Sequence, residues 1–264
     1  MTIFTKTLLA TSAFMIAATA AQAAGEHKNH ALGLTGASTL VMIDTKTAKV
    51  IKTMEVSGVD SLLGIDLRPN TGQIIGVTAD HTIVEIDLET GKATEISKMD
   101  KKLPLVDGQP VIVDFNPKAD KLRFMTGTTN HRVNVDTGAV TVDGSLAFED
   151  SNKGKAPKIV AAAYINSFGK PEGTKMFDID ANLGSVVRQT SPNDGTLAEI
   201  GKLGAEIKGY YGFDVATNEK GENQAWLTAN NALHKVSLET GKVEKSWPIT
   251  GAKDIRDITF LTAK

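Results

Sequence analysis

Short runs of alternating or apolar residues recur along this chain, separated by glycine, asparagine, aspartate and proline residues. The second copy of the pattern spans residues 62–97 and reads LLGIDLRPNTGQIIGVTADHTIVEIDLETGKATEIS. Runs of this length and composition predict short β-strands joined by hairpins. The pattern is written five times with a period of roughly 48 residues, which is typical of a β-propeller. The sequence therefore predicts an all-β fold, a five-bladed β-propeller of four-stranded blades.

Aspartate precedes the tight turn that follows the third strand in three of the copies. The strand that ends at Asp44 in the first copy matches the strand that ends at Asp87 in the second, and Asp136 is aligned with them in the third. The fifth copy keeps the strand and turn of the repeat but has Ser237 at the position of this aspartate, and the fourth copy is looser. An aspartate at this position accepts a hydrogen bond from the backbone two residues on, so we expect a structural role for all three.

The two ends of the repeat predict how the ring closes. The first copy begins with its second strand, at residues 31–36, and has no counterpart of the strand over residues 62–69. The C-terminal run RDITFL, residues 256–261, matches this missing strand. We therefore expect one C-terminal strand to join three N-terminal strands in a single blade, which removes the exposed sheet edges of an open repeat. The propeller domain is predicted to span residues 31–264.

The N-terminus has the pattern of a secretory signal. A short, weakly basic start precedes an apolar stretch over residues 7–20 and an Ala21-Gln22-Ala23 cleavage site. The apolar stretch is too short to span a bilayer comfortably, and a retained anchor is the alternative. We predict a signal peptide over residues 1–23, a flexible tail over residues 24–30, and a periplasmic or secreted protein with no transmembrane segment after processing.

Composition narrows the classes of function and partner. The chain has 29 Lys plus Arg and 31 Asp plus Glu, a formal net charge of -2, and no basic stripe, so no nucleic-acid partner is predicted. It contains no cysteine, which excludes a disulfide, a thiolate nucleophile and a zinc–thiolate site. Aromatic residues make up only 5% of the chain, so valine, isoleucine and leucine are expected to fill the space between blades.

Several longer motifs resemble a known group of exported bacterial proteins. They are Leu63–Pro69, Asp114–Pro117, Asp136–Val140, Val160–Tyr164 and Pro192–Leu197. With these motifs the chain resembles the domain of unknown function 4394 family, over nearly all of the sequence that follows the predicted signal. The resemblance implies a propeller-like all-β domain and carries over no catalytic residue. The first copy departs from the usual Thr-Gly turn, since it has Thr47-Ala48 instead.

Three carboxylates are the strongest candidates for chemistry. Asp66, Asp114 and Asp214 occupy one register position, on the first strand of three copies. The first strand of a propeller blade lies beside the central channel, so these carboxylates are expected to converge and could bind a cation through oxygen ligands. The alternative, which the repetition favours, is that each aspartate accepts hydrogen bonds from neighbouring backbone amides and holds its blade in place.

Basic side chains offer an anion site as another possibility. Arginines lie at or near strands of the same blades and are suited to an anionic ligand. His81 and His131 precede third strands in equivalent blades, so both are expected on loops. The full predicted ligand-binding set is Asp66, Asp114, Asp214, Arg68, Arg123, Arg132, Arg256 and His131.

Two further patterns resemble metal sites but have simpler interpretations. Asp178, Asp180 and Asn182, followed by Gly184, resemble the start of a calcium loop, but the glycine and the expected bidentate acid are misplaced. A hairpin turn is the favoured interpretation. His27 and His30, with Glu26 nearby, could bind copper or nickel near the processed N-terminus. A mobile tail is favoured there.

The sequence carries no recognisable catalytic motif. It has no G-x-S-x-G elbow, H-E-x-x-H motif or Gly-rich phosphate loop. We therefore predict no cofactor and an exported binding or scaffold module for an unidentified protein or small-molecule ligand, with the question of a metal left open. The alternative is a hydrolase or lyase with loop-borne Asp and His residues at the channel mouth, because a site assembled from separate loops leaves no linear trace.

Overall fold

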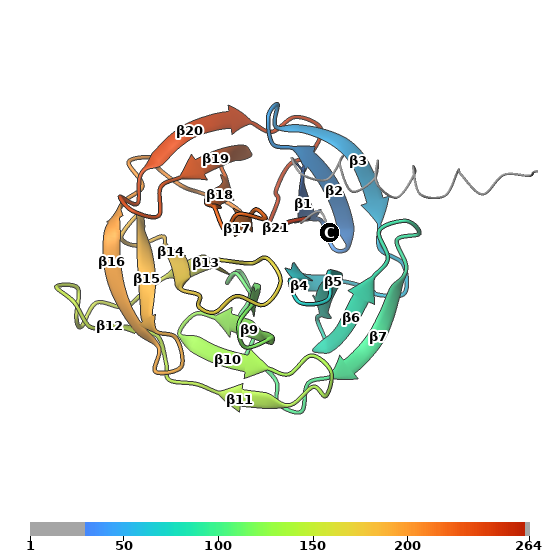
Figure 1. Ribbon diagram of the computed structural model, residues 1–264, viewed down its shortest axis with the longest axis horizontal. Helices are drawn as coiled ribbons and strands as arrows, with labels where there is room; N and C mark the ends of the chain where they lie inside the picture. Colours follow the sequence, from blue (N-terminus) through green and yellow to red (C-terminus); the bar gives the residue numbers. More distant parts are fainter. Residues whose placement is uncertain (1–29, 262–264) are drawn as a thin grey trace, which may run out of the picture.

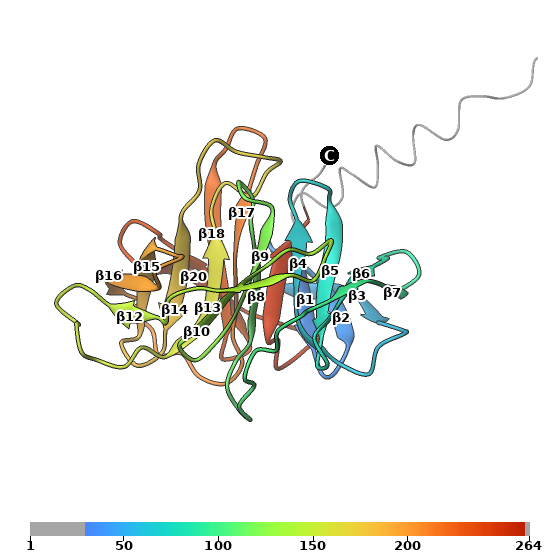
Figure 2. The ribbon, with the colours of Figure 1, turned by 90° about the horizontal axis from the view of Figure 1, so that it is seen from below.

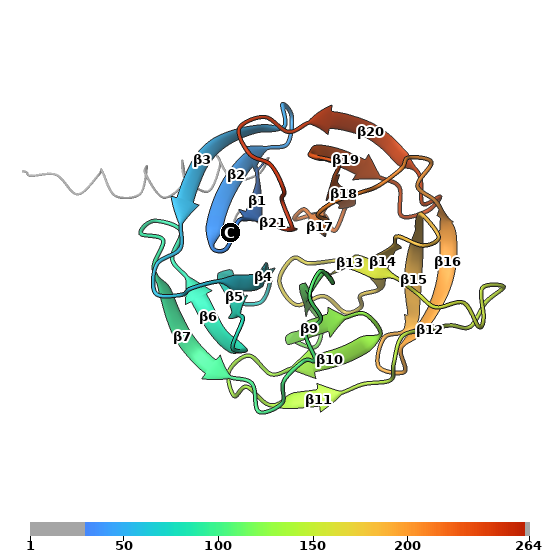
Figure 3. The ribbon, with the colours of Figure 1, turned by 180° about the vertical axis from the view of Figure 1, so that it is seen from behind.

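A ring of five sheets surrounds a central axis in the computed structural model, which describes residues 30–261 (Figure 1). The innermost strand of each sheet lies beside the axis and the outermost forms the rim (Figure 3). The all-β, five-bladed propeller predicted from the repeat is confirmed. The described residues include no helix, so none of them forms a helix that could cross a membrane.

The blades are numbered from the N-terminus, and each is given from its inner to its outer strand. Blade 1 consists of β21 (Asp257–Phe260), β1 (His30–Thr35), β2 (Thr39–Asp44) and β3 (Lys49–Glu55). Blade 2 consists of β4 (Leu62–Arg68), β5 (Gln73–Thr78), β6 (Thr82–Ile86) and β7 (Ala93–Lys98). Blade 3 consists of β8 (Ile112–Asn116), β9 (Lys121–Thr126), β10 (Thr129–Val133) and β11 (Val140–Val142).

The last two blades complete the ring. Blade 4 consists of β13 (Ile159–Tyr164), β14 (Met176–Asp180), β15 (Ser185–Ser191) and β16 (Thr196–Lys202). It carries a fifth strand that the repeat did not predict, β12 (Ala147–Phe148), which pairs in parallel with β16 at the rim. Blade 5 consists of β17 (Gly212–Thr217), β18 (Asn223–Ala229), β19 (Ala232–Val236) and β20 (Val243–Pro248).

The C-terminal strand closes the ring as the sequence predicted. β21 pairs antiparallel with β1, with Ala31 opposite Phe260 and Leu34 opposite Asp257. One blade is therefore built from both ends of the chain, and the inner edge of β1 is covered. The predicted signal peptide and most of the tail lie outside the described residues. His30 is the exception, because it is the first residue of β1.

The hydrophobic core is divided among the five spaces between neighbouring blades. Ile65 and Leu34, for example, belong to the cluster between blades 1 and 2, whereas Phe115 and Ile75 belong to the cluster between blades 2 and 3. Valine, isoleucine and leucine dominate these clusters, as the composition predicted. The inner strand β4 is almost entirely buried, and the rim strand β3 is mostly exposed.

The turn after the third strand uses an aspartate in blades 1 and 2. Asp44 Oδ1 accepts hydrogen bonds from the backbone N–H groups of Lys46 and Thr47, at 3.0 and 2.8 Å. Ala48 then adopts a positive φ of 54° at the position where the other copies have glycine. Asp87 makes the equivalent bonds in blade 2. The prediction is confirmed for these two aspartates.

The prediction for Asp136 is wrong by two residues. In blade 3 the turn is closed by a hydrogen bond from Gly138 N to Asn134 O, and Asn134 Oδ1 accepts the N–H of Asp136 at 3.1 Å. Asn134 is therefore the counterpart of Asp87. Asp136 was matched to Asp87 because both are aspartates. The side-chain oxygen of an asparagine accepts the same backbone hydrogen bond, so Asn134 can take this position.

The Asp-x-Asp-x-Asn run forms the hairpin that was favoured. β14 ends at Asp180 and β15 begins at Ser185. Asp180 Oδ1 accepts the N–H of Leu183 at 2.7 Å, inside the turn, and Oδ2 accepts the N–H of Lys158 at 2.8 Å. Both oxygens of this carboxylate thus accept backbone hydrogen bonds, as in a structural turn.

Candidate cation site in the central channel

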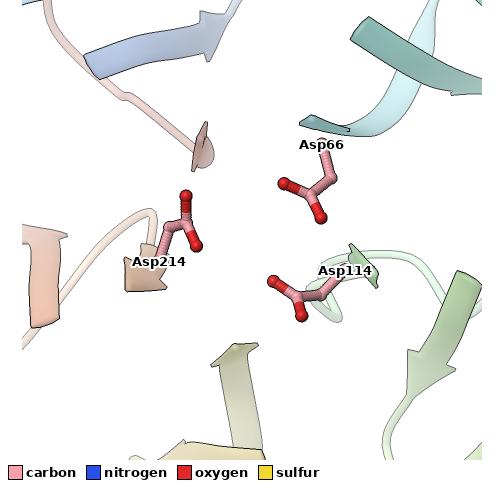
Figure 4. A group of neighbouring side chains, drawn as sticks. All are labelled: Asp66, Asp114 and Asp214. Carbon is pink, nitrogen blue, oxygen red and sulfur yellow. The ribbon is translucent and has the colours of Figure 1, made fainter. Parts of the chain in front are cut away.

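Three inner strands bring Asp66, Asp114 and Asp214 together at the axis of the ring. Asp66 comes from β4, Asp114 from β8 and Asp214 from β17. One oxygen of each carboxylate lies within 4.8 Å of the others, and the carboxylates face one another across the channel (Figure 4). The residues are 6%, 4% and 5% exposed. The convergence expected from their shared register position is therefore present.

Each of these carboxylates also binds the backbone of a neighbouring blade. Asp66 Oδ2 accepts the N–H of Phe115 at 2.7 Å. Asp114 Oδ1 accepts the N–H of Tyr164 at 2.9 Å, and Asp214 Oδ2 accepts the N–H of Phe260 at 2.8 Å. Every bond joins one inner strand to the next, so the aspartates connect adjacent blades beside the channel. The two interpretations of the sequence, a structural role and convergence on a possible ligand, are compatible.

Blades 1 and 4 have no aspartate at this register position and show how the arrangement varies. In blade 1, Thr259 accepts the N–H of Leu67 at 3.0 Å through Oγ1, and its hydroxyl donates to Asp66 Oδ1 at 2.7 Å. Thr259 therefore links blade 1 to blade 2, as the aspartates link blade 2 to blade 3, blade 3 to blade 4 and blade 5 to blade 1. In blade 4 the corresponding residue is Ala163, whose side chain has no acceptor. At the boundary between blades 4 and 5, Val215 N therefore donates to Asp214 Oδ1 within its own blade, at 2.6 Å.

A fourth buried carboxylate lies two residues before Thr259. Asp257 Oδ2 accepts the N–H of Ile65 at 2.8 Å, and Oδ1 accepts the N–H of Ile258 at 3.0 Å. The neighbouring strand leaves room for it, because a Cβ on Gly64 would lie 2.7 Å from Asp257 Oδ2. Asp257 was not among the predicted site residues. The sequence could have indicated it, because Asp257 lies in the run 256–261 that matches the inner strand of a blade.

Burial raises the pKa of all four carboxyl groups above the ordinary value of an aspartate. The pKa of Asp66 and the pKa of Asp114 are raised well above the ordinary value, first by burial and then by the charge of neighbouring carboxylates. Burial raises the pKa of Asp214 to about 6. Burial also raises the pKa of Asp257, and the charge of Arg256 opposes this shift. No Lys, Arg or His within residues 30–261 forms an ion pair with any of the four.

A carboxylate oxygen with no donor among the described residues, together with a small cavity, allows this cluster to bind a cation. Asp114 Oδ2 accepts no hydrogen bond from any described residue, although its residue is almost completely buried. A cavity of about 10 Å³ lies beside Asp66 and Asp214, which is about the smallest space that holds one water-sized particle. Carboxylate oxygens are the ligands that Ca²⁺ and Mg²⁺ prefer.

A larger cleft adjoins this cavity. It has a volume of about 540 Å³ and is lined by Phe168 and Leu261, by the β17–β18 loop, and by Ala216, Thr217 and Phe260. The last three residues also line the small cavity beside the carboxylates. The loops that follow β13 and β17 project from one face of the ring (Figure 2). The cleft therefore lies at the mouth of the channel on that face.

The predicted arginines are placed elsewhere and are used within the fold. Arg68 pairs with Asp120 and Asp136, at 2.6 and 2.7 Å. Arg123 and Arg132 both pair with Asp143, at 2.7 and 3.0 Å. Arg256 donates to the backbone carbonyl groups of Gly36, Ala37, Leu62 and Leu63. The structure does not bring these four side chains to the carboxylate cluster.

Replacing Arg68 by Met is expected to lower the free energy of unfolding by about 2–3 kcal/mol. The Arg68 side chain is 7% exposed and that of Asp120 is 28% exposed, so water screens this ion pair less than it screens a surface pair. The matched control is Lys98→Met, which breaks the pair with Asp80 between side chains that are 55% and 60% exposed; it should cost less than about 1 kcal/mol. Urea unfolding of both variants checks the difference, and equal losses would contradict it.

The histidines do not join the cluster. His131 lies within β10, so the prediction that it falls on a loop is wrong: the strand begins at Thr129, three residues earlier than the equivalence with His81 implies. His81 precedes β6 and accepts the N–H of Leu103 through Nε2 at 3.0 Å. His234 contacts the Ser246 hydroxyl at 2.7 Å. Burial lowers the pKa of all three, so they are neutral at pH 7.

Comparison with known proteins places this chain in a family. Residues 39–259 match the sequence profile described as "Domain of unknown function (DUF4394)". The chain belongs to this family. The resemblance drawn from the sequence motifs is thereby confirmed, and the family name describes no activity. No curated protein sequence matches the chain.

Solved structures share the fold of this DUF4394 chain at low sequence identity. A protein of unknown function from Bacteroides thetaiotaomicron VPI-5482 superposes with a TM-score of 0.52 and 17% identity, over 88% of this chain and 64% of that one. An auxiliary nutrient binding protein from Bacteroides ovatus ATCC 8483 gives a TM-score of 0.50 and 9% identity, over 82% and 54%. The chain thus spans less than two thirds of the length of both. At these identities the likeness concerns the fold alone.

Proposed function

We propose that this DUF4394 protein is an exported binding module whose ring holds one divalent cation in its central channel and presents the adjoining cleft to a small-molecule ligand. The observation that carries the proposal is the convergence of three buried carboxylates, from three different blades, with oxygens within 4.8 Å of one another. Export rests on the signal pattern of residues 1–23.

The cluster requires positive charge or protons to be stable. Several carboxylates buried together cannot all be ionised without a compensating charge, because each loses hydration and repels the others. No basic side chain in the described part of the chain pairs with them. At neutral pH the cluster must therefore carry protons or bind a cation. A divalent cation removes the repulsion among all three carboxylates at once.

Calcium fits the donor set best. The ligands are oxygens only, which excludes preference for a soft metal. Hydrogen bonds from the backbone hold the Asp66 and Asp214 carboxylates in place, while Asp114 Oδ2 has no donor among the described residues. Calcium accepts irregular oxygen geometry, whereas magnesium requires a near-ideal octahedron and retains several waters. The small volume beside Asp66 and Asp214 supports a cation with few bound waters.

The adjoining cleft supports the ligand-binding part of the proposal. Its volume of about 540 Å³ is in the range of small-molecule sites, which combine apolar walls with a few polar groups. Phe168 and Phe260 supply the apolar walls, and Asn218, Lys220 and Gln224 supply polar groups. The alternative, a hydrolase or lyase, would require an acid–base partner beside the carboxylates. Of the four described histidines, His81, His131 and His234 are buried within the blades, and none of the four is grouped with these carboxylates.

Titration of calcium into metal-free protein tests the proposal. We expect saturable binding with one site per chain at neutral pH by isothermal titration calorimetry. Asp114→Asn should weaken calcium binding by roughly a hundredfold, since loss of a buried charged ligand is worth about 3 kcal/mol. The melting temperature of the metal-free variant should stay unchanged or rise, because the asparagine oxygen still accepts the N–H of Tyr164 and the repulsion is smaller.

The matched control is Asp107→Asn, which removes the same charge from an exposed loop. It should bind calcium as the parent protein does. Absence of saturable calcium binding by the parent, or equal weakening by the two substitutions, would contradict the proposed cation site.

A further inference from the structure

Arg188 differs from the other four arginines of this chain. Arg68, Arg123 and Arg132 form ion pairs, and Arg256 donates to four carbonyl groups. Arg188, on β15, has no hydrogen bond or ion pair of its side chain with any described residue. Its Nε atom is buried and has no acceptor. A buried N–H group without a partner is unfavourable, so a missing acceptor is indicated.

Arg188 lines a cleft of about 330 Å³ between blades 3 and 4. Lys118, from the β8–β9 turn, and Lys175, which immediately precedes β14, line the same cleft. Neither lysine forms an ion pair within the described part of the chain. No Asp or Glu lines the cleft. Three unpaired cations therefore share one concave surface in a protein whose net charge is -2.

The remaining wall of the cleft is polar. Asn116, Tyr164 and Asn193 contribute to it. The Tyr164 hydroxyl accepts hydrogen bonds from Arg123 at 3.2 and 3.3 Å, and Asn193 Oδ1 accepts one at 3.2 Å. The hydrogen bonds from Arg123 fix the orientation of the Tyr164 and Asn193 side chains. Two residues that line the cleft donate hydrogen bonds to acidic side chains: the Thr190 hydroxyl donates to Glu149, and the Ser191 hydroxyl donates to Asp194.

We propose that this cleft binds the anionic group of a small molecule, a phosphoryl, sulfate or carboxylate group, with Arg188 as its principal contact. A guanidinium pairs with such oxyanions through two parallel hydrogen bonds, and lysines add charge without geometric demand. The volume accommodates a small molecule rather than a polymer.

This anion site is separate from the proposed cation site and does not depend on it. The β13–β14 loop contributes Phe168 to the cleft at the channel mouth and Gly173, Thr174 and Lys175 to the anion cleft. The two clefts therefore flank one loop, which is among those that project from one face of the ring in the edge-on view of Figure 2. A ligand bound at the anion cleft lies beside the face that carries the proposed ligand cleft.

Calorimetric titration of metal-free protein with inorganic phosphate, sulfate and acetate, in EDTA, tests the proposal. We expect saturable binding of at least one of the three, weakened by added KCl because the contacts are ionic. The probe that binds most tightly identifies the anionic group. Arg188→Gln should weaken that binding by about tenfold to a hundredfold, the value of a hydrogen bond to a charged group. Lys118→Gln, at an exposed turn, should weaken it by a smaller factor and leaves the strand intact.

The control is Lys170→Gln, which removes one positive charge from the same β13–β14 loop but lies outside the cleft. It should bind the probe as the parent protein does. The proposal is overturned if the parent binds none of the three anions saturably. It is also overturned if Lys170→Gln weakens binding as much as Lys118→Gln, since the anion would then respond only to overall charge.

Discussion

Deletion of residues 255–264 is expected to abolish the cooperative unfolding of this propeller. The deletion removes β21, the inner strand of blade 1, and uncovers the edge of β1. It also removes Phe260 from the core between blades 5 and 1, and Leu261 from the core between blades 1 and 2. The hydrogen bonds that Thr259 and Asp257 make to blade 2 are lost with them. Because the inner strands connect all five blades, we expect aggregation or a broad, non-cooperative thermal transition.

Two controls separate ring closure from mere shortening. Deletion of residues 262–264 alone leaves β21 complete and should leave the melting curve unchanged. Phe260→Ala keeps the strand but removes a buried aromatic side chain, so it should cost about 3–5 kcal/mol and preserve cooperative unfolding. Circular dichroism melts and size-exclusion chromatography report both outcomes. A cooperative, soluble protein after deletion of residues 255–264 would show that β21 is not essential to the ring.

The metal-free protein is expected to lose several kcal/mol of stability between about pH 5 and about pH 7.5. Burial raises the pKa of Asp178 to about 7 and that of Asp214 to about 6, and it also raises the pKa of Asp66 well above its ordinary value. A carboxyl group whose pKa is higher in the folded state binds its proton more tightly there. Its contribution is therefore present at low pH and is lost as the pH rises through the folded-state pKa.

Stability should also fall below about pH 4, so it should be greatest near pH 5. Hydrogen bonds from Ser185 and Lys202 lower the pKa of Glu199 to about 2, and hydrogen bonds from Thr90 and Glu89 lower the pKa of Asp87. These groups stabilise the fold only while ionised, and their contribution is lost on acidification. Thermal melts across this range, in EDTA, check the profile.

Calcium is expected to change the profile only on its alkaline side. At neutral pH, calcium at a hundred times its dissociation constant should add about 2.7 kcal/mol of stability, whereas at about pH 5 protons compete for the same carboxylates. Asp178 lies outside the cation cluster, where its carboxylate accepts two hydrogen bonds from Gln189. Asp178→Asn should therefore reduce the loss of stability above pH 5 but leave the calcium effect intact. Equal calcium effects at both pH values would contradict this account.

The periodic parts of the structure were predictable from the sequence, and the exceptions were not. Four-stranded blades and closure by the C-terminal strand follow from a hydrophobic pattern that repeats, because each copy must pack in the same way. The convergence of Asp66 and Asp114 follows from their shared register on inner strands. In blade 1, Thr259 accepts the backbone hydrogen bond that an aspartate accepts in blades 2, 3 and 5. A search for repeated carboxylates does not find this residue, because its acceptor is a hydroxyl group.

The non-repeated features required coordinates. Asn134 closes the turn that was assigned to Asp136, since the two residues lie two positions apart and offer similar oxygen acceptors. The sequence analysis included Arg68 in the predicted ligand-binding set and left Arg188 out. The first is neutralised by carboxylates from the next blade, and the second has no partner among the described residues. Ion pairing between blades depends on loops whose positions no local pattern encodes.

The most direct test of the central claim is native mass spectrometry of the metal-free protein after addition of calcium at neutral pH. The account predicts one calcium ion per chain, retained in the folded charge states, and no bound ion in the Asp114→Asn variant at the same calcium concentration. The Asp107→Asn control should retain the ion. A parent protein that binds no calcium, or that retains the same number of ions after Asp114→Asn, would contradict a cation site formed by Asp66, Asp114 and Asp214.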